Sequence, residues 1–194
     1  MKITFKTSAL LAALTCSAKK DLRTYLQGVN IQIKRADVGM IYGTDGHILF
    51  AGQLPYETDA PVEALNVIIP LETIKKVNKR VDVVALECTN GEYFLDGIRF
   101  LPLDGTFPDV ARVIPDIESN IEQKADDFNP ELLVRARDAL SLYTGVKPKG
   151  GFSLIQRGNE SAVMHAGRSD CLVVVMPLRS NFRESYAGFN RDFA

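Results

Sequence analysis

The sequence predicts an α+β protein built from three copies of one βαβββ unit, in which a strand and a helix precede three antiparallel strands. Three observations lead to this prediction. The helices are expected to begin at residues 8, 71 and 130, so the copies are 63 and 59 residues apart. Each helix precedes three strand-like apolar runs. The chain has 194 residues, of which 46% are hydrophobic, so it can bury a substantial core.

Each unit opens with a short strand that leads into an amphipathic helix. Pro70 suits a first helical turn, Asn129 can cap the third helix, and Pro130 suits its first position. The expected strands are 2–5, 66–69 and 125–128, and the expected helical segments are 8–20, 70–81 and 129–140.

A meander of three antiparallel strands follows each helix. Asn90-Gly91 and Asp96-Gly97 separate apolar runs in the second unit, and such pairs favour tight hairpins. The expected strands are 28–34, 38–42 and 47–51, then 82–88, 92–95 and 98–101, then 152–155, 162–165 and 171–175.

Polar linkers at 57–64 and 116–124 divide the chain. The division predicts a complete domain over 1–117, with units 1–56 and 64–117, and a single unit over 118–179. Residues 180–194 form a C-terminal tail, with Tyr186, Phe189 and Phe193 among polar residues. A docking tail and a disordered end are both open for this segment, and partial disorder is favoured.

Composition narrows the class of protein. The formal net charge of −1 excludes a uniformly basic surface but allows a local basic face. The longest apolar runs have the length of strands, so no membrane span is expected. Residues 8–18 resemble a lipoprotein signal that ends near Cys16, but polar interruptions favour an amphipathic helix. Three cysteines without metal-binding spacing favour a reduced, cytoplasmic protein.

Few residues point to catalysis. His47 and His165 lack the spacing of a zinc site, and Cys171 begins an apolar strand, which is typical of a structural thiol. Asp45 and His47 could form a catalytic pair, but Asp-Gly favours a turn at this position. We therefore expect no enzymatic activity, no metal and no cofactor.

Cations gather on one side of the second predicted helix, opposite an apolar side formed by Leu71, Ile74, Asn78 and Val81. Such a cluster can contact phosphates, although a solvated helix face is the commoner outcome. Further cations follow the first helix, whereas the outer side of the third helix is expected to mix Arg135 with Glu131 and Asp138. The candidate DNA-contacting residues are Lys19, Lys20, Arg23, Lys75, Lys76, Lys79 and Arg80.

Five segments together resemble the bacterial sliding clamp, the beta subunit of DNA polymerase III. They are residues 21–28, 43–47, 66–70, 104–115 and 173–179. The resemblance implies the DNA-clamp fold, in which each of three domains holds two such units. Residues 1–117 match the middle domain, and 118–179 match the last half of the final domain.

The resemblance also implies a function without catalysis. A clamp is a processivity factor in DNA replication that encircles duplex DNA, contacts its phosphate backbone without sequence specificity and tethers a DNA polymerase. Other clamp-motif proteins and a clamp loader are further expected partners. The alternative is a clamp mimic that binds replication proteins without encircling DNA, and so competes with them or recruits them.

The chain has three units where a family protomer has six, and this departure puts ring formation in doubt. A family ring contains twelve units, so four chains of three units would be needed for a homotetrameric ring. A dimer that covers the exposed half-domain and a monomer are the other possibilities. An unpaired half-domain would expose a sheet edge unless a partner covers it.

The resemblance finally implies a pocket that binds short peptide motifs. Ile48 stands where the family commonly has arginine, which removes a hydrogen-bond donor. Without the resemblance, ordinary strand core would be the favoured interpretation of these positions. The pocket residues carried over are Leu26, Thr44, Gly46, His47, Leu49, Pro108, Arg112, Val113, Val174, Met176, Pro177 and Leu178.

Overall fold

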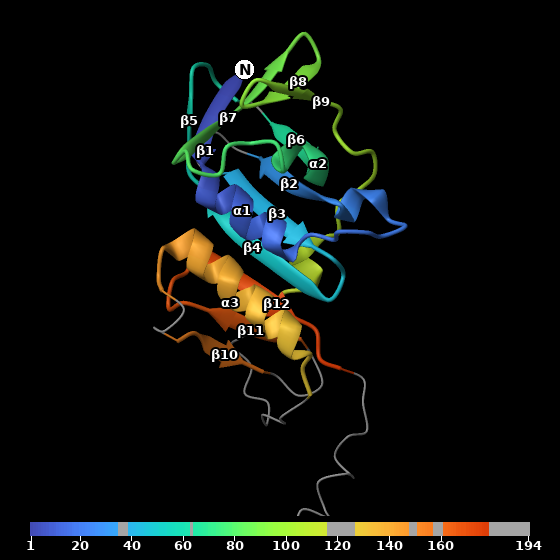
Figure 1. Ribbon diagram of the computed structural model, residues 1–194, viewed down its shortest axis with the longest axis vertical. Helices are drawn as coiled ribbons and strands as arrows, with labels where there is room; N and C mark the ends of the chain where they lie inside the picture. Colours follow the sequence, from blue (N-terminus) through green and yellow to red (C-terminus); the bar gives the residue numbers. More distant parts are fainter. Residues whose placement is uncertain (35–38, 63, 116–126, 148–150, 157–160, 179–194) are drawn as a thin grey trace, which may run out of the picture.

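The computed structural model describes residues 1–34, 39–62, 64–115, 127–147, 151–156 and 161–178. It contains two antiparallel sheets with helices packed against them (Figure 1), which confirms the predicted α+β class. The predicted tail at 180–194 lies outside the described residues. In the part of the chain that is described, no helix is long and apolar enough to cross a membrane.

The order of helices and strands along the chain divides into the three predicted units. The first unit holds β1 (Lys2–Lys6), α1 (Thr7–Cys16), η1 (Thr24–Leu26), β2 (Gly28–Ile33), β3 (Gly39–Thr44) and β4 (Ile48–Leu54), followed by β5 (Tyr56–Thr58). The second unit holds β6 (Leu65–Pro70), α2 (Leu71–Ile74), β7 (Val83–Thr89), β8 (Glu92–Leu95), β9 (Ile98–Phe100) and η2 (Val110–Arg112). The third unit holds α3 (Pro130–Thr144), β10 (Ser153–Ile155), β11 (Ala162–His165) and β12 (Cys171–Val175).

The first two units exchange their opening strands. One sheet has the order β5-β1-β7-β8-β9, so β1 pairs with the meander of the second unit. The other has the order β10-β11-β12-β4-β3-β2-β6, so β6 pairs with the meander of the first unit. The last strand of the third unit, β12, extends this second sheet by pairing with β4.

Helix α1 packs closely on β3 because small residues face each other. Ala9, Ala12 and Ala13 are buried, and a Cβ atom added at Gly43 would lie 1.8 Å from the carbonyl oxygen of Ala13. The helix ends at Cys16, earlier than the predicted residue 20. The Ser17 hydroxyl donates to the carbonyl oxygens of both Ala13 and Gly28, which holds the chain as it leaves the helix.

Helix α2 is much shorter than predicted. The expected helix over 70–81 is wrong, because α2 ends at Ile74 and the chain continues in turns. The side chain of Asn78 accepts a hydrogen bond from the backbone N–H of Arg80, at 3.1 Å. This local bond competes with helical pairing. Asn78 and Val81, predicted on the apolar side, are exposed.

Helix α3 begins as predicted. The Asn129 side chain accepts a hydrogen bond from the N–H of Glu131, at 2.9 Å, and Pro130 occupies the first turn. The helix runs four residues beyond the predicted end and stops at Gly145, whose φ of 73° is left-handed. Of the strand expected before it, residues 125 and 126 lie outside the described part, and Asp127 and Phe128 are not in a strand.

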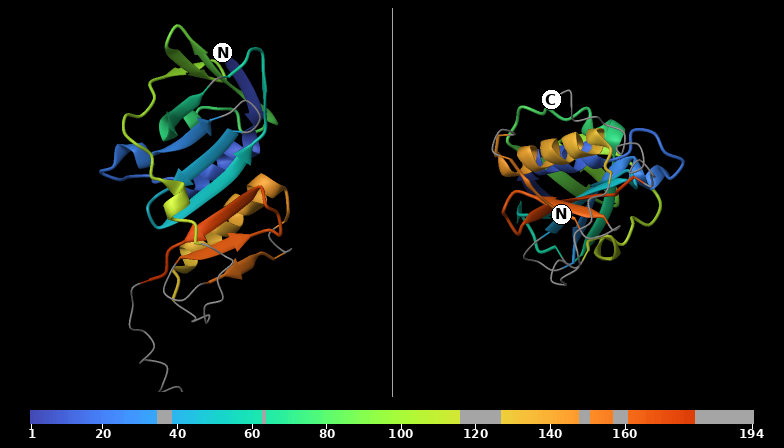
Figure 2. Two further views of the ribbon diagram at one scale, coloured as in Figure 1. Left: turned by 180° about the vertical axis from the view of Figure 1, so that it is seen from behind. Right: turned by 90° about the horizontal axis from the view of Figure 1, so that it is seen from below.

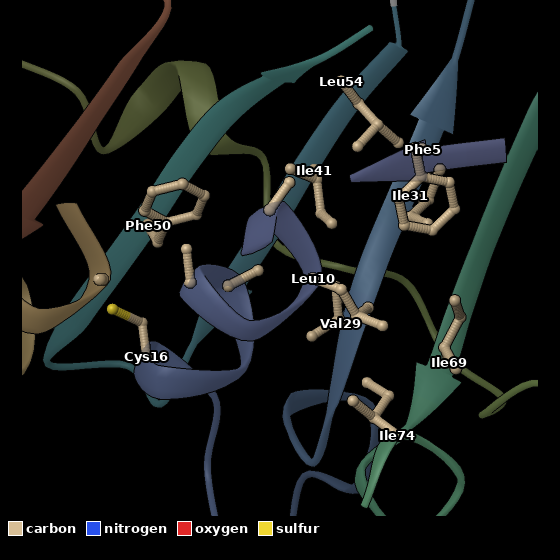
Figure 3. Packing of buried hydrophobic residues seen from close by; sticks show 14 of the residues in the cluster. Phe5, Leu10, Cys16, Val29, Ile31, Ile41, Phe50, Leu54, Ile69 and Ile74 are labelled. Atoms are coloured by element: carbon tan, nitrogen blue, oxygen red, sulfur yellow. The ribbon is translucent and has the colours of Figure 1, made fainter. Parts of the chain in front are cut away.

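The nine predicted meander strands are present, with ends shifted by a few residues. The chain also forms β5, which lies largely in the predicted linker 57–64 and pairs with β1. Buried side chains of α1 and the strands meet in one core (Figure 3), and α3 extends it through Leu132, Ala136 and Leu140. The division into domains stays a prediction.

Candidate functional site: a groove at the β4–β12 junction

A groove of about 200 Å³ lies where β4 and β12 meet, and we call it the β4–β12 groove. Three parts of the chain that are distant in sequence form its walls: the turn before β4, the segment around η2, and the end of β12. In Figure 2 (left) the η2 segment lies beside this junction. The lining residues are Arg23, Thr44, Gly46, His47, Ile48, Leu49, Pro108, Val110, Val113, Val174 and Met176.

Hydrogen bonds within the turn between β3 and β4 fix the first wall. The Thr44 hydroxyl donates to the carbonyl oxygen of Ile48 at 2.7 Å and accepts from the N–H of Gly46 at 3.0 Å. The Asp45 carboxylate accepts from the N–H groups of His47 and Ile48. Gly46 has a φ of 92°, which favours glycine, so the turn presents His47 in a defined position.

Sheet pairing fixes the second wall. Val174 in β12 lies opposite Leu49 in β4. Beyond the end of β12, the N–H of Met176 donates to the carbonyl oxygen of His47 at 2.9 Å. This bond places the Met176 side chain at the groove, where its flexible thioether can adapt to an apolar ligand.

The third wall is the segment that contains η2. The Asp109 side chain accepts from the N–H of Ala111 at 3.2 Å, which caps η2. The Ser161 hydroxyl donates to the carbonyl oxygen of Val113 at 3.3 Å and so links this segment to the third unit. Pro108, Val110 and Val113 line the groove from this side.

One cation lies at the groove. The guanidinium of Arg23 is close to Gly46 and forms an ion pair with Asp21, at 2.8 Å. Hydrogen bonds from the side chain and the backbone N–H of Arg23 lower the pKa of Asp21 from 3.8 to about 2. The ion pair holds Arg23 beside apolar walls, so the groove combines apolar surface with one oriented donor.

The structure brings together most of the predicted pocket residues. Among the remaining ones, Leu26 is buried, whereas Arg112 is exposed and pairs with Asp109. Pro177 and Leu178 follow Met176 but do not line the groove. Those that line it are Thr44, Gly46, His47, Leu49, Pro108, Val113, Val174 and Met176.

Sequence reasoning missed three lining residues, Arg23, Ile48 and Val110. Arg23 was assigned to DNA contact, but its guanidinium lies at the groove. The sequence predicts for Ile48 only the loss of a hydrogen-bond donor. Val110 lies between Pro108 and Val113, and that spacing was the one available signal.

The other candidate DNA-contacting residues lie elsewhere. Lys76, Lys79 and Arg80 are exposed in the turns after α2, and Lys75 pairs with Glu72 at 2.7 Å. Lys19 and Lys20 are exposed in the segment after α1. Because α2 ends at Ile74, the four cations at 75–80 do not share a helix face.

Comparisons with known proteins show which fold the chain shares. No protein-family model and no curated protein sequence matches the chain. A DNA polymerase sliding clamp from Pseudomonas aeruginosa is similar in structure, with a TM-score of 0.65 and 19% identity over 93% of this chain and 66% of that one. A Helicobacter pylori beta clamp bound to a DNA ligase peptide has a TM-score of 0.67 and 12% identity, over 92% and 66% of the two chains.

A sliding clamp from Bacillus subtilis gives a TM-score of 0.61 and 16% identity, over 93% of this chain and 64% of that one. The chain thus spans about two thirds of the length of these proteins. The TM-scores establish a shared fold, and identities below 20% add nothing beyond it. The chain therefore has the fold of the bacterial DNA polymerase sliding clamp, over about two thirds of that protein's length.

Proposed function

We propose that this chain is a clamp-like processivity factor that captures replication proteins in the β4–β12 groove and holds a DNA polymerase at duplex DNA. The observation that carries the proposal is the groove itself, which gathers apolar side chains from all three units in a protein with the sliding-clamp fold. The proposal gives no residue a catalytic role.

The shape of the groove suits a short peptide. Its volume of about 200 Å³ admits one or two apolar side chains, since sites for whole drug-sized ligands are larger. Leu49, Val113 and Met176 supply apolar contacts, and Arg23 supplies a donor for a backbone carbonyl or a carboxylate. The ligand class is therefore an extended peptide with an apolar anchor, of the kind found in clamp-interaction motifs.

Contact with DNA is the second part of the proposal. Exposed lysines and arginines can neutralise phosphates and release counterions, which attracts duplex DNA without reading its sequence. Arg23 leaves this set because it lies at the groove. The residues proposed for DNA contact are Lys19, Lys20, Lys75, Lys76, Lys79 and Arg80. Assembly into a homo-oligomer and opening by a loader complete the clamp-like cycle.

The alternative is a clamp mimic that binds the same peptides without encircling DNA. The observation that favours it is that α2 ends at Ile74, so the four cations at 75–80 do not form the basic helix face expected to contact DNA. Retention on closed circular DNA separates the two functions. A processivity factor stays on closed circular DNA and slides off once the circle is cut. A mimic is retained on neither the closed circle nor the cut one.

Peptide binding tests the proposal first. A fluorescein-labelled polymerase peptide with a clamp-interaction motif is titrated with the protein, and its anisotropy is followed. Met176→Ala should weaken binding about 5- to 100-fold, as truncation of a buried apolar anchor does. Leu178→Ala is the matched control and should have a smaller effect, because Leu178 does not line the groove. Absence of binding by the unaltered protein would contradict the proposal.

A further inference from the structure

The first two units bury each other's sheet edges in the same way. Leu86 in β7 lies opposite Ile3, and Ile31 in β2 lies opposite Val67. Ile3 and Val67 are both the fourth residue before a helix, so the two pairings have equivalent registers. Leu86 and Ile31 are 0% exposed as a result. Exchange of opening strands is therefore how two such units complete one domain.

The third unit carries the equivalent of Leu86 in a strand with an open edge. The third residue from the end of β9 is Ile98, which lies opposite Leu95, and Leu95 lies opposite Leu86. The third residue from the end of β12 is Val173. It lies opposite Met164 in β11, which lies opposite Leu154 in β10, so Leu154 is the equivalent of Leu86. In the sheet formed by the described residues β10 is an end strand, and Leu154 is 43% exposed.

In the third unit, a backbone hydrogen bond fixes the segment before α3 at the place where a complete unit has its opening strand. The carbonyl oxygen of Asp127, three residues before α3, accepts from the N–H of Leu178, three residues after β12. In the second unit the carbonyl oxygen of Ile68 accepts from Leu103 at the same two offsets. The first unit pairs Thr4 with Glu57, again at these offsets.

Phe128, which follows Asp127, is less buried than the equivalent residues of the first two units. Phe128 is the second residue before its helix, as Phe5 and Ile69 are in the complete units. Phe5 and Ile69 are buried, but Phe128 is only half-buried. Phe152 in front of β10 is half-buried as well, whereas its equivalents Val84 and Val29 are buried.

We infer that the third units of two copies of this chain pair about a two-fold axis and complete one domain. The segment that holds Phe128 in one copy lies beside β10 of the other, and the reverse contact forms at the same time. Phe5 lies opposite Val84, and Ile69 lies opposite Val29, so the equivalent pairing sets Phe128 of one copy opposite Phe152 of the second copy.

A second copy fits better than an unrelated partner, because the same unit carries both halves of the contact. Each third unit offers an opening segment and a meander edge, and these are the two elements that the first and second units exchange. A self-complementary surface of this kind is the basis of two-fold dimers. Charge does not oppose the pairing, since the described charged residues of the unit balance: Asp127, Glu131, Asp138 and Asp170 against Arg135, Arg137, Lys147 and Arg168.

Molar mass in solution tests the inference. Light scattering after size-exclusion chromatography should give a mass of two chains of 21.4 kDa, or a multiple of two. Leu154→Glu should halve that mass, because a carboxylate cannot be buried in the joint core. Leu22→Glu is the matched control, since Leu22 is fully exposed and lies outside the third unit, and should leave the mass unchanged. A single-chain mass for the unaltered protein, or an unchanged mass for Leu154→Glu, would overturn the inference.

Cross-linking checks the register without relying on a disruptive substitution. Phe128→Cys and Phe152→Cys are combined with Cys88→Ser, because Cys88 is the partly exposed native thiol and Cys16 and Cys171 are buried. A short thiol-reactive cross-linker should give a covalent dimer. Phe128→Cys combined with Leu22→Cys should give none, and equal cross-linking of the two variants would contradict the pairing. The groove forms within one chain, so Leu154→Glu should still bind the peptide, which separates this inference from the proposed function.

Discussion

Arg135 on α3 forms an ion pair with Asp45, with 2.5 Å between Nη1 and Oδ2. The same guanidinium donates to the carbonyl oxygens of Thr15 and Ser17 at the end of α1, which has no basic residue of its own in its last turn. A residue of the third unit thereby caps a helix of the first unit and holds the turn that forms one wall of the β4–β12 groove.

Replacing Arg135 should destabilise the protein and loosen the groove. Arg135→Ala leaves the Asp45 carboxylate and two helix-end carbonyls without this donor, and the pair is only partly exposed. We expect a loss of about 1–3 kcal/mol in the free energy of unfolding, measured by urea denaturation. Arg137→Ala is the control, because among the described residues Arg137 pairs only with its neighbour Asp138, and the change should alter stability by under about 0.5 kcal/mol. Equal effects of the two substitutions would show that the contact to Asp45 adds nothing.

A side chain at Gly43 should separate α1 from the sheet. The added Cβ would meet backbone atoms of Ala13, which cannot move without shifting the helix. Gly43→Ala should therefore cost about 3 kcal/mol or more, above the usual cost of overpacking. Gly39→Ala lies in the same strand, where the nearest atom is 3.2 Å away on the flexible Ile33 side chain, and should cost far less. Thermal unfolding of both variants provides the comparison, and similar losses would refute the close packing.

The Asp21–Arg23 pair predicts a pH dependence with a definite sign. The pKa of Asp21 is lowered to about 2 in the folded protein, below the value of about 3.9 in an unfolded chain. The pair therefore stabilises the fold fully above about pH 4, and this stabilisation is lost as the pH falls through about 2. Carboxyl NMR should show Asp21 titrating near pH 2 and, in Arg23→Ala, near pH 4. A titration midpoint that does not move would show that Arg23 is not its partner.

Removal of the cations after α2 should affect DNA and leave peptide binding intact. The variant replaces Lys75, Lys76, Lys79 and Arg80 with Ala. The slope of log affinity for duplex DNA against log salt concentration should become shallower by about 0.9 for each lost phosphate contact. The control replaces Lys2, Lys6, Arg99 and Lys147, which removes as much charge elsewhere. If the slope becomes shallower by the same amount in both variants, the effect on DNA binding is one of general charge. If peptide binding is lost, the assignment of two separate surfaces is wrong.

Local signals explain how much of the fold was predictable. Asn90 and Gly91 both have positive φ, at 52° and 79°, and so form the tight turn that their sequence indicates. Asn129 caps α3 for the same local reason. The predicted helix over 70–81 failed because periodicity alone does not show that Asn78 bonds to the backbone. The outward position expected for Arg135 was wrong as well, since its partners Thr15 and Asp45 are far away in sequence.

The groove was predictable only in part. Its walls are joined by contacts between distant segments, such as Met176 with His47 and Ser161 with Val113, and no local pattern encodes them. The resemblance to sliding clamps supplied eight lining residues, but Arg23 and Val110, although they lie in matched segments, are not among the pocket residues that it implies. Their places depend on how the segments before β2 and after β9 fold back onto β4.

Methyl NMR of methionine tests the central claim most directly. The chain has four methionines, and among them only Met176 lines the β4–β12 groove. Addition of a clamp-interaction peptide to protein labelled at the methionine methyl groups should shift the Met176 resonance and leave those of Met1, Met40 and Met164 in place. An unshifted Met176 resonance at saturating peptide would contradict the account, because the peptide would then bind elsewhere or not at all.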